Sequence, residues 1–124
     1  MFRQIRKHHD FMWGYSAALL KTFTRPSMVF LIFLSNTMVL LNALVFYWVE
    51  GHINPAITSY FDALYFAVTV MSSVGLGDLH PITTGGRVVT MIMMVLGTGI
   101  FVCFTAVLAA AILELEQMNK QKGA

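Results

Sequence analysis

The sequence predicts an all-α membrane protein in which two membrane-spanning helices flank one short helix and an irregular loop. Hydrophobic residues make up 57% of the 124 residues and charged residues only 11%, whereas a soluble domain carries about 25% charged residues. Two apolar stretches without a formal charge, residues 26–49 and 88–113, each exceed the roughly 20 residues that span a bilayer. The length of the chain suits one domain.

Residues 1–25 are predicted to form an interfacial amphipathic helix that lies on the membrane surface. Their apolar side chains fall roughly on one helical face, and their basic side chains lie largely off it. Trp13 and Tyr15 suit the headgroup region. The helix is expected to end at Arg25, because the residue before a proline is pushed out of the α region.

The first predicted membrane helix covers residues 26–49. Pro26 suits its start, because proline is favourable in a first helical turn. Three strongly polar residues interrupt the apolar sequence and are expected to face other helices rather than lipid: Ser35, Asn36 and Asn42. Tyr47 and Trp48 mark the far membrane interface.

A short helix is predicted over residues 59–72, after the turn-rich loop that begins at Glu50. Ser59 and Asp62 match a capping box, in which the N-cap hydroxyl and an acid three residues on bind each other's main-chain amides. A helix of this length measures roughly 20 Å, which is too short to cross a bilayer. We therefore expect this helix to be re-entrant or buried.

The second membrane helix is predicted over residues 86–115, and residues 119–124 are predicted to form a cytoplasmic tail. Five Lys or Arg residues precede the first span, one lies at position 87 and two lie in the tail. By the positive-inside rule, both termini are cytoplasmic and residues 50–86 face outward, in a multi-pass protein of the cell membrane.

The glycine-rich segment over residues 73–78, Ser-Val-Gly-Leu-Gly-Asp, follows the short helix. Irregular backbone at membrane depth is tolerated only where it is buried in protein or lines an aqueous path. An ordinary strand points successive carbonyls to opposite sides, and aligning them on one side requires dihedral angles of alternating hand. Glycine enters positive φ almost freely, at a position where other residues lose roughly 1 kcal/mol or more. Gly75 and Gly77, alternating with Val74 and Leu76, meet that requirement.

A row of aligned carbonyls can replace the water shell of an ion, which makes a pore the hypothesis for this segment. The hydroxyl of Ser73 can add an oxygen ligand at the inner end, and Asp78 places a carboxylate at the outer mouth. The C-terminal end of the preceding helix carries about half a negative charge, which favours a cation in the middle of the membrane.

The run Ser72-Ser-Val-Gly-Leu-Gly-Asp78 resembles the potassium-channel signature, usually written Thr-Val-Gly-Tyr-Gly-Asp. Residues 63–69 and 83–87 also resemble that family, as does a glycine at position 97, so the resemblance covers roughly residues 28–118. The sequence is similar to the pore module of prokaryotic potassium channels with two membrane helices. Residues 26–118 are accordingly expected to form a pore domain, in which the short helix is the pore helix.

The resemblance implies a homotetramer in the lipid bilayer, with a selectivity filter over residues 73–78 and the second helices lining the inner pore. Potassium is implied as the permeant ion, with no other cofactor. The residues implied as its ligands, mainly through main-chain carbonyls, are Ser73, Val74, Gly75, Leu76 and, at the outer end, Gly77 beside Asp78.

Two residues depart from the family signature. Ser73 replaces a threonine and keeps its hydroxyl, whereas Leu76 replaces a tyrosine whose side chain forms a hydrogen bond behind the filter in the family. Leucine cannot form that bond. Tyr65 and Phe66 stand where the family often has tryptophan, and we expect the Tyr65 hydroxyl to bind the Asp78 carboxylate instead.

Two glycines interrupt the second span. Gly97 and Gly99 lower helical propensity by about 1 kcal/mol each relative to alanine. The resemblance implies a gating hinge there, chiefly at Gly97, and close helix packing, which small residues favour in membranes, is the alternative. Four residues at helical spacing below the hinge are expected to line the pore: Phe101, Thr105, Ala109 and Ile112.

The tail resembles the start of the linker that leads to cytoplasmic ligand-sensing, regulator-of-conductance domains in related channels, so a truncated pore module is expected. Two other functions stay open. Leu76 leaves open a weakly selective or non-selective cation channel of the same architecture, and a non-conducting membrane subunit is the second alternative. No nucleophile–base pair predicts an enzyme, and no basic stretch mixed with aromatic residues predicts nucleic-acid binding.

Overall fold

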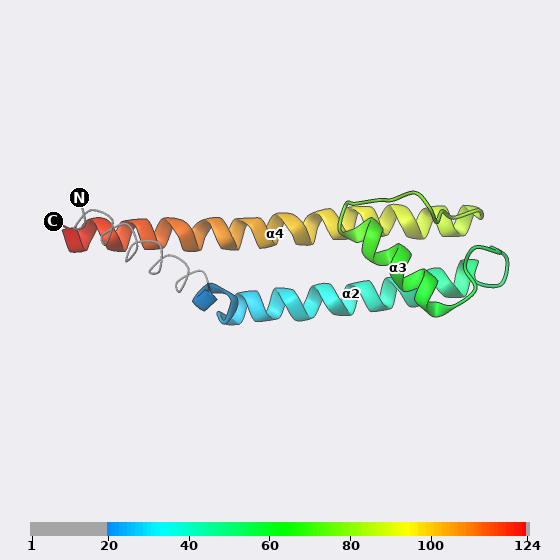
Figure 1. Cartoon of the computed structure of the whole chain (residues 1–124), viewed down its shortest axis with the longest axis horizontal. Coiled ribbons are helices and arrows are strands. Elements are labelled where there is room, and N and C mark those ends of the chain that lie inside the picture. Colours follow the sequence, from blue (N-terminus) through cyan, green and yellow to red (C-terminus); the bar gives the residue numbers. More distant parts are fainter. Residues whose placement is uncertain (1–19, 124) are drawn as a thin grey trace, which may run out of the picture. The chain divides into compact units, whose positions relative to one another are not determined.

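Three helices organise the part of the chain that the computed structural model describes, residues 20–123 (Figure 1). They are α2 (Pro26–Glu50), α3 (Tyr60–Met71) and α4 (Thr84–Gly123). Two long apolar helices therefore flank a short one, which confirms the predicted all-α class of the chain. The predicted interfacial helix falls largely on residues 1–19, which lie outside the described residues.

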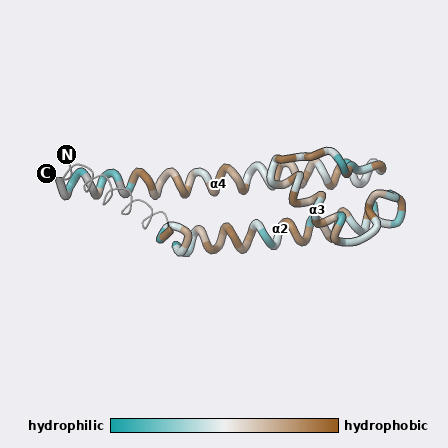
Figure 2. The backbone as a smooth tube through the Cα atoms, viewed as in Figure 1, coloured by the Kyte–Doolittle hydropathy of each residue, from teal (hydrophilic) through white to brown (hydrophobic). Residues whose placement is uncertain are grey.

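Within residues 20–123, two stretches are long and apolar enough to cross a membrane, namely α2 and residues 84–118 of α4. Figure 2 shows hydrophobic residues along much of both helices. The membrane character predicted from composition is thus carried by two separate helices. α4 begins at Thr84 and continues past residue 115, where its end was expected, to Gly123.

α2 begins at Pro26 because the chain turns immediately before it. Residues 20–23 are helical, and the main-chain amide and the hydroxyl of Thr24 then both donate to the Lys21 carbonyl, at 3.2 and 2.8 Å. Proline has no amide hydrogen to donate, and the first turn of a helix does not require one. The next helix can therefore start directly at this proline.

The polar side chains inside α2 bind their own helix. The Ser35 hydroxyl and the Asn36 amide both donate to the Ile32 carbonyl, at 3.1 and 2.8 Å. The Asn42 amide donates to the Met38 carbonyl at 2.8 Å. These bonds satisfy part of the polar capacity within the helix, which lowers the cost of placing such groups in a membrane span. The expectation that these residues face other helices stays a prediction.

α3 begins with the predicted capping box, which is confirmed. The Ser59 hydroxyl accepts from the Asp62 amide at 3.3 Å, and the Asp62 carboxylate accepts from the amides of Ser59 and Thr58 at 2.8 and 2.9 Å. The helix proper has 12 residues, and at about 1.5 Å per residue it is too short to span a bilayer. The predicted range 59–72 equals this helix with its two caps, Ser59 and Ser72.

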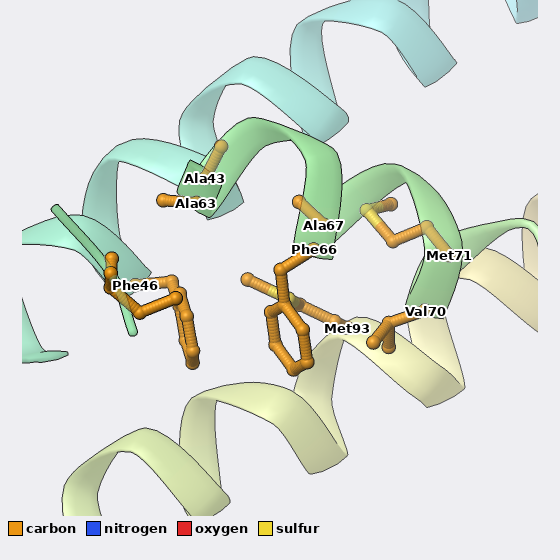
Figure 3. Close-up of a cluster of buried hydrophobic side chains, with 9 residues drawn as sticks. Ala43, Phe46, Ala63, Phe66, Ala67, Val70, Met71 and Met93 are labelled. Carbon is orange, nitrogen blue, oxygen red and sulfur yellow. The ribbon is translucent and has the colours of Figure 1, made fainter. Parts of the chain in front are cut away.

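The core of the unit formed by residues 31–103 lies where α3 meets the two long helices (Figure 3). Phe46 of α2 stacks on Phe66 of α3, with ring centroids 4.3 Å apart. Met93 of α4 is fully buried in the same cluster, and Ala63 and Ala67 of α3 present small side chains there. This cluster fixes the short helix between parts of α2 and α4, and so fixes the point at which the glycine-rich segment begins.

A second unit contains residues 20–30 and 104–123 of the described chain. Here the Arg25 guanidinium pairs with the Glu114 carboxylate at 2.7 Å, and both side chains are about half exposed. Exposed ion pairs of this kind contribute little to stability, about 0–1 kcal/mol. Met28 and Ala111 are buried.

Candidate functional site

The backbone of the glycine-rich segment alternates in hand. Positive φ angles occur at every second residue, with 62° at Ser73, 52° at Gly75 and 77° at Gly77, while Val74 and Leu76 keep negative φ. The two glycines were expected in this conformation. Ser73 was not, because a serine in the left-handed region loses about 1–2 kcal/mol relative to the right-handed one. The positive φ of Ser73 follows if the two-residue spacing of Gly75 and Gly77 is extended one step toward the N-terminus.

This alternation is the geometry that turns successive carbonyl groups toward one side of a strand-like segment. No regular secondary structure covers residues 74–76, so their carbonyls are not used in a helix or sheet ladder. The side chains of Val74 and Leu76 are 63% and 62% exposed in the single chain. Residues 74–76 and the side chains of Val74 and Leu76 are therefore left uncovered by the rest of the chain.

The N-terminal end of the segment is bound to the C-terminal turn of α3. The Thr69 carbonyl accepts from the amides of Val74 and Gly75 at 3.0 and 2.9 Å, and from the Ser72 hydroxyl at 3.2 Å. The Ser73 amide donates to the Val70 carbonyl at 3.0 Å. Carbonyls that a helix end leaves unpaired are thus used to fix the next segment. The negative end of the α3 dipole lies directly beside the first residues of the glycine-rich segment.

The predicted bond between Tyr65 and Asp78 is present. The Tyr65 hydroxyl donates to the Asp78 carboxylate at 2.8 Å. This hydrogen bond raises the pKa of the Tyr65 phenol, because an adjacent carboxylate disfavours the phenolate. The Thr69 hydroxyl donates to a carbonyl of its own helix, that of Phe66, at 2.8 Å. The C-terminal end of the segment, at Asp78, is therefore bound to α3 through one aromatic side chain.

Two residues that the sequence did not single out bind the chain just after the segment. Glu50 and Asn54 are buried and form hydrogen bonds with residues 80–83. The turn-rich composition around them indicated only a loop. The burial of this carboxylate could not be predicted from the local sequence, because its partners lie more than 30 residues away along the chain.

The two glycines of α4 have different surroundings. A Cβ atom at Gly97 would lie 2.6 Å from the Cα atom and 2.9 Å from the carbonyl carbon of Met71, at the end of α3. A Cβ atom at Gly99 would meet no atom of the subunit within 4 Å. Gly97 therefore permits close approach of two helix backbones, which supports the packing interpretation. The hinge stays a prediction.

The residues expected to line the inner pore fall in both units. Phe101 belongs to the unit of residues 31–103, and the others belong to the second unit. Three of the side chains are exposed and Ile112 is half-buried; the exposed ones are Phe101, Thr105 and Ala109. Exposure in a single chain does not distinguish a pore from a lipid surface, so their lining role stays a prediction.

Comparison with known proteins gives a family match over most of these elements. A protein family described as ion channels matches residues 34–114, which include α3, the glycine-rich segment and most of both long helices. Most of the site described above lies inside this range.

Several curated relatives carry channel names. A calcium-gated potassium channel, TvoK, of Thermoplasma volcanium is 35% identical over 66 residues, which cover 53% of this chain and 19% of the relative. A probable potassium channel protein of Methanocaldococcus jannaschii is 33% identical over 91 residues, 73% of this chain and 25% of the relative. A voltage-gated potassium channel, Kch, of Escherichia coli is 38% identical over 55 residues, 44% of this chain and 13% of the relative. This chain thus corresponds to a quarter or less of each.

Proposed function

Because this chain belongs to the ion channel family matched over residues 34–114, we propose that it forms a potassium-selective pore and conducts K⁺ passively across a membrane. The observation that carries the proposal is the alternation of positive and negative φ over residues 73–77. The potassium-channel names of the relatives support the choice of ion.

In this proposal, main-chain carbonyls replace the hydration shell of the ion. The ligands are the carbonyls of Ser73, Val74, Gly75 and Leu76, with the Ser73 hydroxyl at the inner end. Gly77 and Asp78 form the outer end. Neutral carbonyl ligands in successive sites bind an ion firmly enough for entry and weakly enough for exit. The C-terminal ends of the α3 helices stabilise a cation before it enters the row.

A complete ring of ligands requires more than one subunit, so we propose a homotetramer with α4 lining the inner pore and Gly97 as part of its gating region. Both termini lie on the cytoplasmic side in this arrangement, in agreement with the basic residues of the N-terminal segment. Since TvoK is named a calcium-gated channel and most of its length lies outside the match, we further propose that a cytoplasmic ligand-sensing domain controls opening.

A weakly selective cation channel is the second candidate, and Leu76 favours it. The leucine side chain has no hydrogen-bonding group, so it cannot stiffen the segment as a tyrosine would. Tyr65 ties the segment at Asp78, two residues further on. The two candidates therefore differ in how rigidly the carbonyl rings are held.

The test is the reversal potential of the purified protein in planar bilayers with K⁺ on one side and Na⁺ on the other. Selective conduction is expected to shift the potential by about 59 mV for each tenfold permeability ratio of monovalent ions. Current that reverses near zero would replace the first proposal with the second. Absence of current from correctly inserted protein would instead indicate a non-conducting subunit. Gly77→Ala serves as the control for leak, since the same preparation should lose the K⁺ current.

A further inference from the structure

Arg87, in the first turn of α4, is the one Lys or Arg residue between residues 26 and 119. Its side chain is exposed, and the ion pair found among the described residues joins Arg25 and Glu114 instead. A cation in the first turn of a helix lies at the positive end of the helix dipole, which is unfavourable without an anion nearby. Because a guanidinium binds a carboxylate well, these properties favour an acidic partner for Arg87 from outside its own subunit.

Asp62, in the first turn of α3, has a carboxylate with one oxygen occupied and one accessible. Its Oδ2 atom accepts from the amides and hydroxyls of Thr58 and Ser59, at 2.8 to 3.0 Å. The hydrogen bond from the Thr58 hydroxyl, followed by those from Ser59, lowers the pKa of Asp62 and so favours the ionised form. Within residues 20–123, no hydrogen bond reaches its Oδ1 atom, and no buried side-chain oxygen there lacks a partner. The Oδ1 atom is thus open to a donor from another chain.

Asp62 and Arg87 lie at a similar level in the same unit of the fold. The end of α2 and the start of α4 are level with each other, because the last residue of α2 accepts from the Thr83 amide at 2.9 Å. The ring of Tyr60, two residues before Asp62, lies 6.3 Å from the ring of Tyr47, three residues before the end of α2. Arg87 follows Thr83 by four residues. Both charges therefore lie about one helical turn from the joined helix ends.

Arg87 begins an exposed stripe along α4. Met91 and Met94 follow it at spacings of four and three residues, with 56% and 52% of their surface exposed, and exposed Phe101 lies seven residues further. Phe101 is the first residue predicted to line the inner pore. The stripe therefore lies on the side of α4 that faces the other subunits in the proposed homotetramer.

α3 has an exposed apolar side with the matching order of residues. Phe61, Tyr65 and Val68 are exposed and follow one another at spacings of four and three residues, and Asp62 borders the start of this side. α3 thus presents a carboxylate beside aromatic and aliphatic side chains, whereas α4 presents a guanidinium followed by methionines. Methionine is adaptable in shape and packs well against aromatic rings. The two surfaces are complementary in both charge and polarity.

Two other carboxylates occur in residues 26–113, and Asp62 is favoured over both. Glu50 is fully buried and already accepts hydrogen bonds from residues 54, 82 and 83. Asp78 accepts from the Tyr65 hydroxyl at 2.8 Å and follows the glycine-rich segment. Asp62 is the one of the three that lies on α3 itself, and it lies at the level of Arg87.

We propose that Arg87 of one subunit pairs with the Asp62 carboxylate of a second copy of the chain, while Met91 and Met94 cover the apolar side of α3 in that copy. The inference rests on the proposed function, because it requires the homotetramer. Each α4 helix is then linked at its start to the α3 helix of a neighbour. An anionic lipid headgroup is the other partner that a guanidinium takes, and the test separates the two.

The first test is a double-mutant cycle on the rate at which tetramers exchange subunits, measured by native mass spectrometry in lipid-free detergent. Arg87→Gln and Asp62→Asn each remove one charge and keep most of the side-chain volume. We expect each to speed exchange by at least about fivefold, because several exposed pairs are lost together, and the double variant to be no faster than either single one. In the control, which combines Arg87→Gln with Asp78→Asn, the two effects should multiply.

Three outcomes of this cycle would overturn the proposal. The first is wild-type exchange in Arg87→Gln, and the second is independent effects of Arg87→Gln and Asp62→Asn. The third is an effect of Arg87→Gln that appears only after phosphatidylglycerol is added, because it would identify a lipid headgroup as the partner.

The second test leaves both charges in place and decides the question if Asp62→Asn does not assemble. Two differently tagged chains, both with Cys103→Ser, carry either Phe61→Cys or Met91→Cys and are assembled together. A short bismaleimide should join one chain of each kind, whereas chains with Phe61→Cys and Glu116→Cys should stay separate. Absence of the mixed dimer from assembled tetramers would overturn the contact and leave the channel function standing. Tetramers that form the mixed dimer but carry no current would overturn only the channel function.

Discussion

At the scale of single residues, the conformation of Ser73 depends on its surroundings more than on its own preference. Its amide is bound to the Val70 carbonyl, and the next two amides are bound to the Thr69 carbonyl. These three bonds hold a non-glycine residue at positive φ, which its own preference opposes by about 1–2 kcal/mol. The glycines two and four positions later need no such support.

Replacing Tyr65 with phenylalanine should speed the decay of current during a maintained stimulus. The substitution removes the hydroxyl that binds Asp78 and leaves the ring, so packing against neighbouring residues should be retained. This hydrogen bond is exposed to solvent, and loss of a bond that contributes about 0.5–1.5 kcal/mol corresponds to about a two- to tenfold change in a rate. Recordings from purified protein in bilayers measure it. Tyr60→Phe, which removes a hydroxyl that donates to the Leu40 carbonyl, is the control; equal decay in the Tyr65 variant and the wild type would contradict the role of the bond.

Residue-level prediction from sequence succeeded where the signal was local. The glycine spacing predicted positive φ at Gly75 and Gly77, and the resemblance to the potassium-channel signature, in which Tyr65 stands where the family often has tryptophan, predicted the Tyr65–Asp78 bond. The sequence did not indicate that Glu50 is buried and hydrogen-bonded, because its partners are 32 and 33 residues away. An acid at the end of an apolar helix is ordinarily solvated, and only the fold removes it from water.

At the scale of elements, α3 is determined at both ends by its own sequence. Ser59 and Asp62 set its start, and Ser72 caps its end. The start of α2 follows from Pro26 in the same way. The end of α4 was harder to predict, because Glu114 and Glu116 mark where the apolar stretch ends rather than where helix formation ends. Residues 114–122 hold no glycine or proline, and the helix continues to Gly123.

Gly97→Ala should disturb the contact between α4 and α3 far more than Gly99→Ala. The added methyl at position 97 collides with the main chain of Met71, which cannot rotate away, whereas at position 99 it meets open space. On helical propensity alone, both changes would stabilise α4 by about 1 kcal/mol. We expect Gly97→Ala to lower the thermal stability of the assembled protein by several degrees, and Gly99→Ala to leave it unchanged or raise it. A hinge without a packing role predicts similar stability for the two variants.

At the scale of the whole molecule, one subunit leaves a large apolar face on α3 uncovered. Phe61, Tyr65 and Val68 are exposed and share one side of the helix, at spacings of four and three residues. In the proposed tetramer, a neighbouring subunit covers this face of α3.

Native mass spectrometry of the purified protein should therefore give four times the subunit mass of 13.9 kDa. Val68→Glu places a charge on the uncovered α3 face and should shift the protein to smaller species. Val68→Ile keeps the face apolar and should retain the tetramer. A stable tetramer in the Val68→Glu protein would show that this face is not a subunit contact.

The alternating φ angles also make the conformation of the proposed conducting segment depend on the chirality of its residues. At Gly77, φ is 77° and an L-methyl group would meet no atom of its own subunit within 4 Å, so the penalty for L-alanine is conformational, about 1–2 kcal/mol, rather than a collision. The D enantiomer prefers this same φ. A chain assembled by chemical ligation with D-alanine at position 77 should retain the K⁺ current that L-alanine abolishes. Equal losses of current with both enantiomers would show that this glycine is not needed for its positive φ.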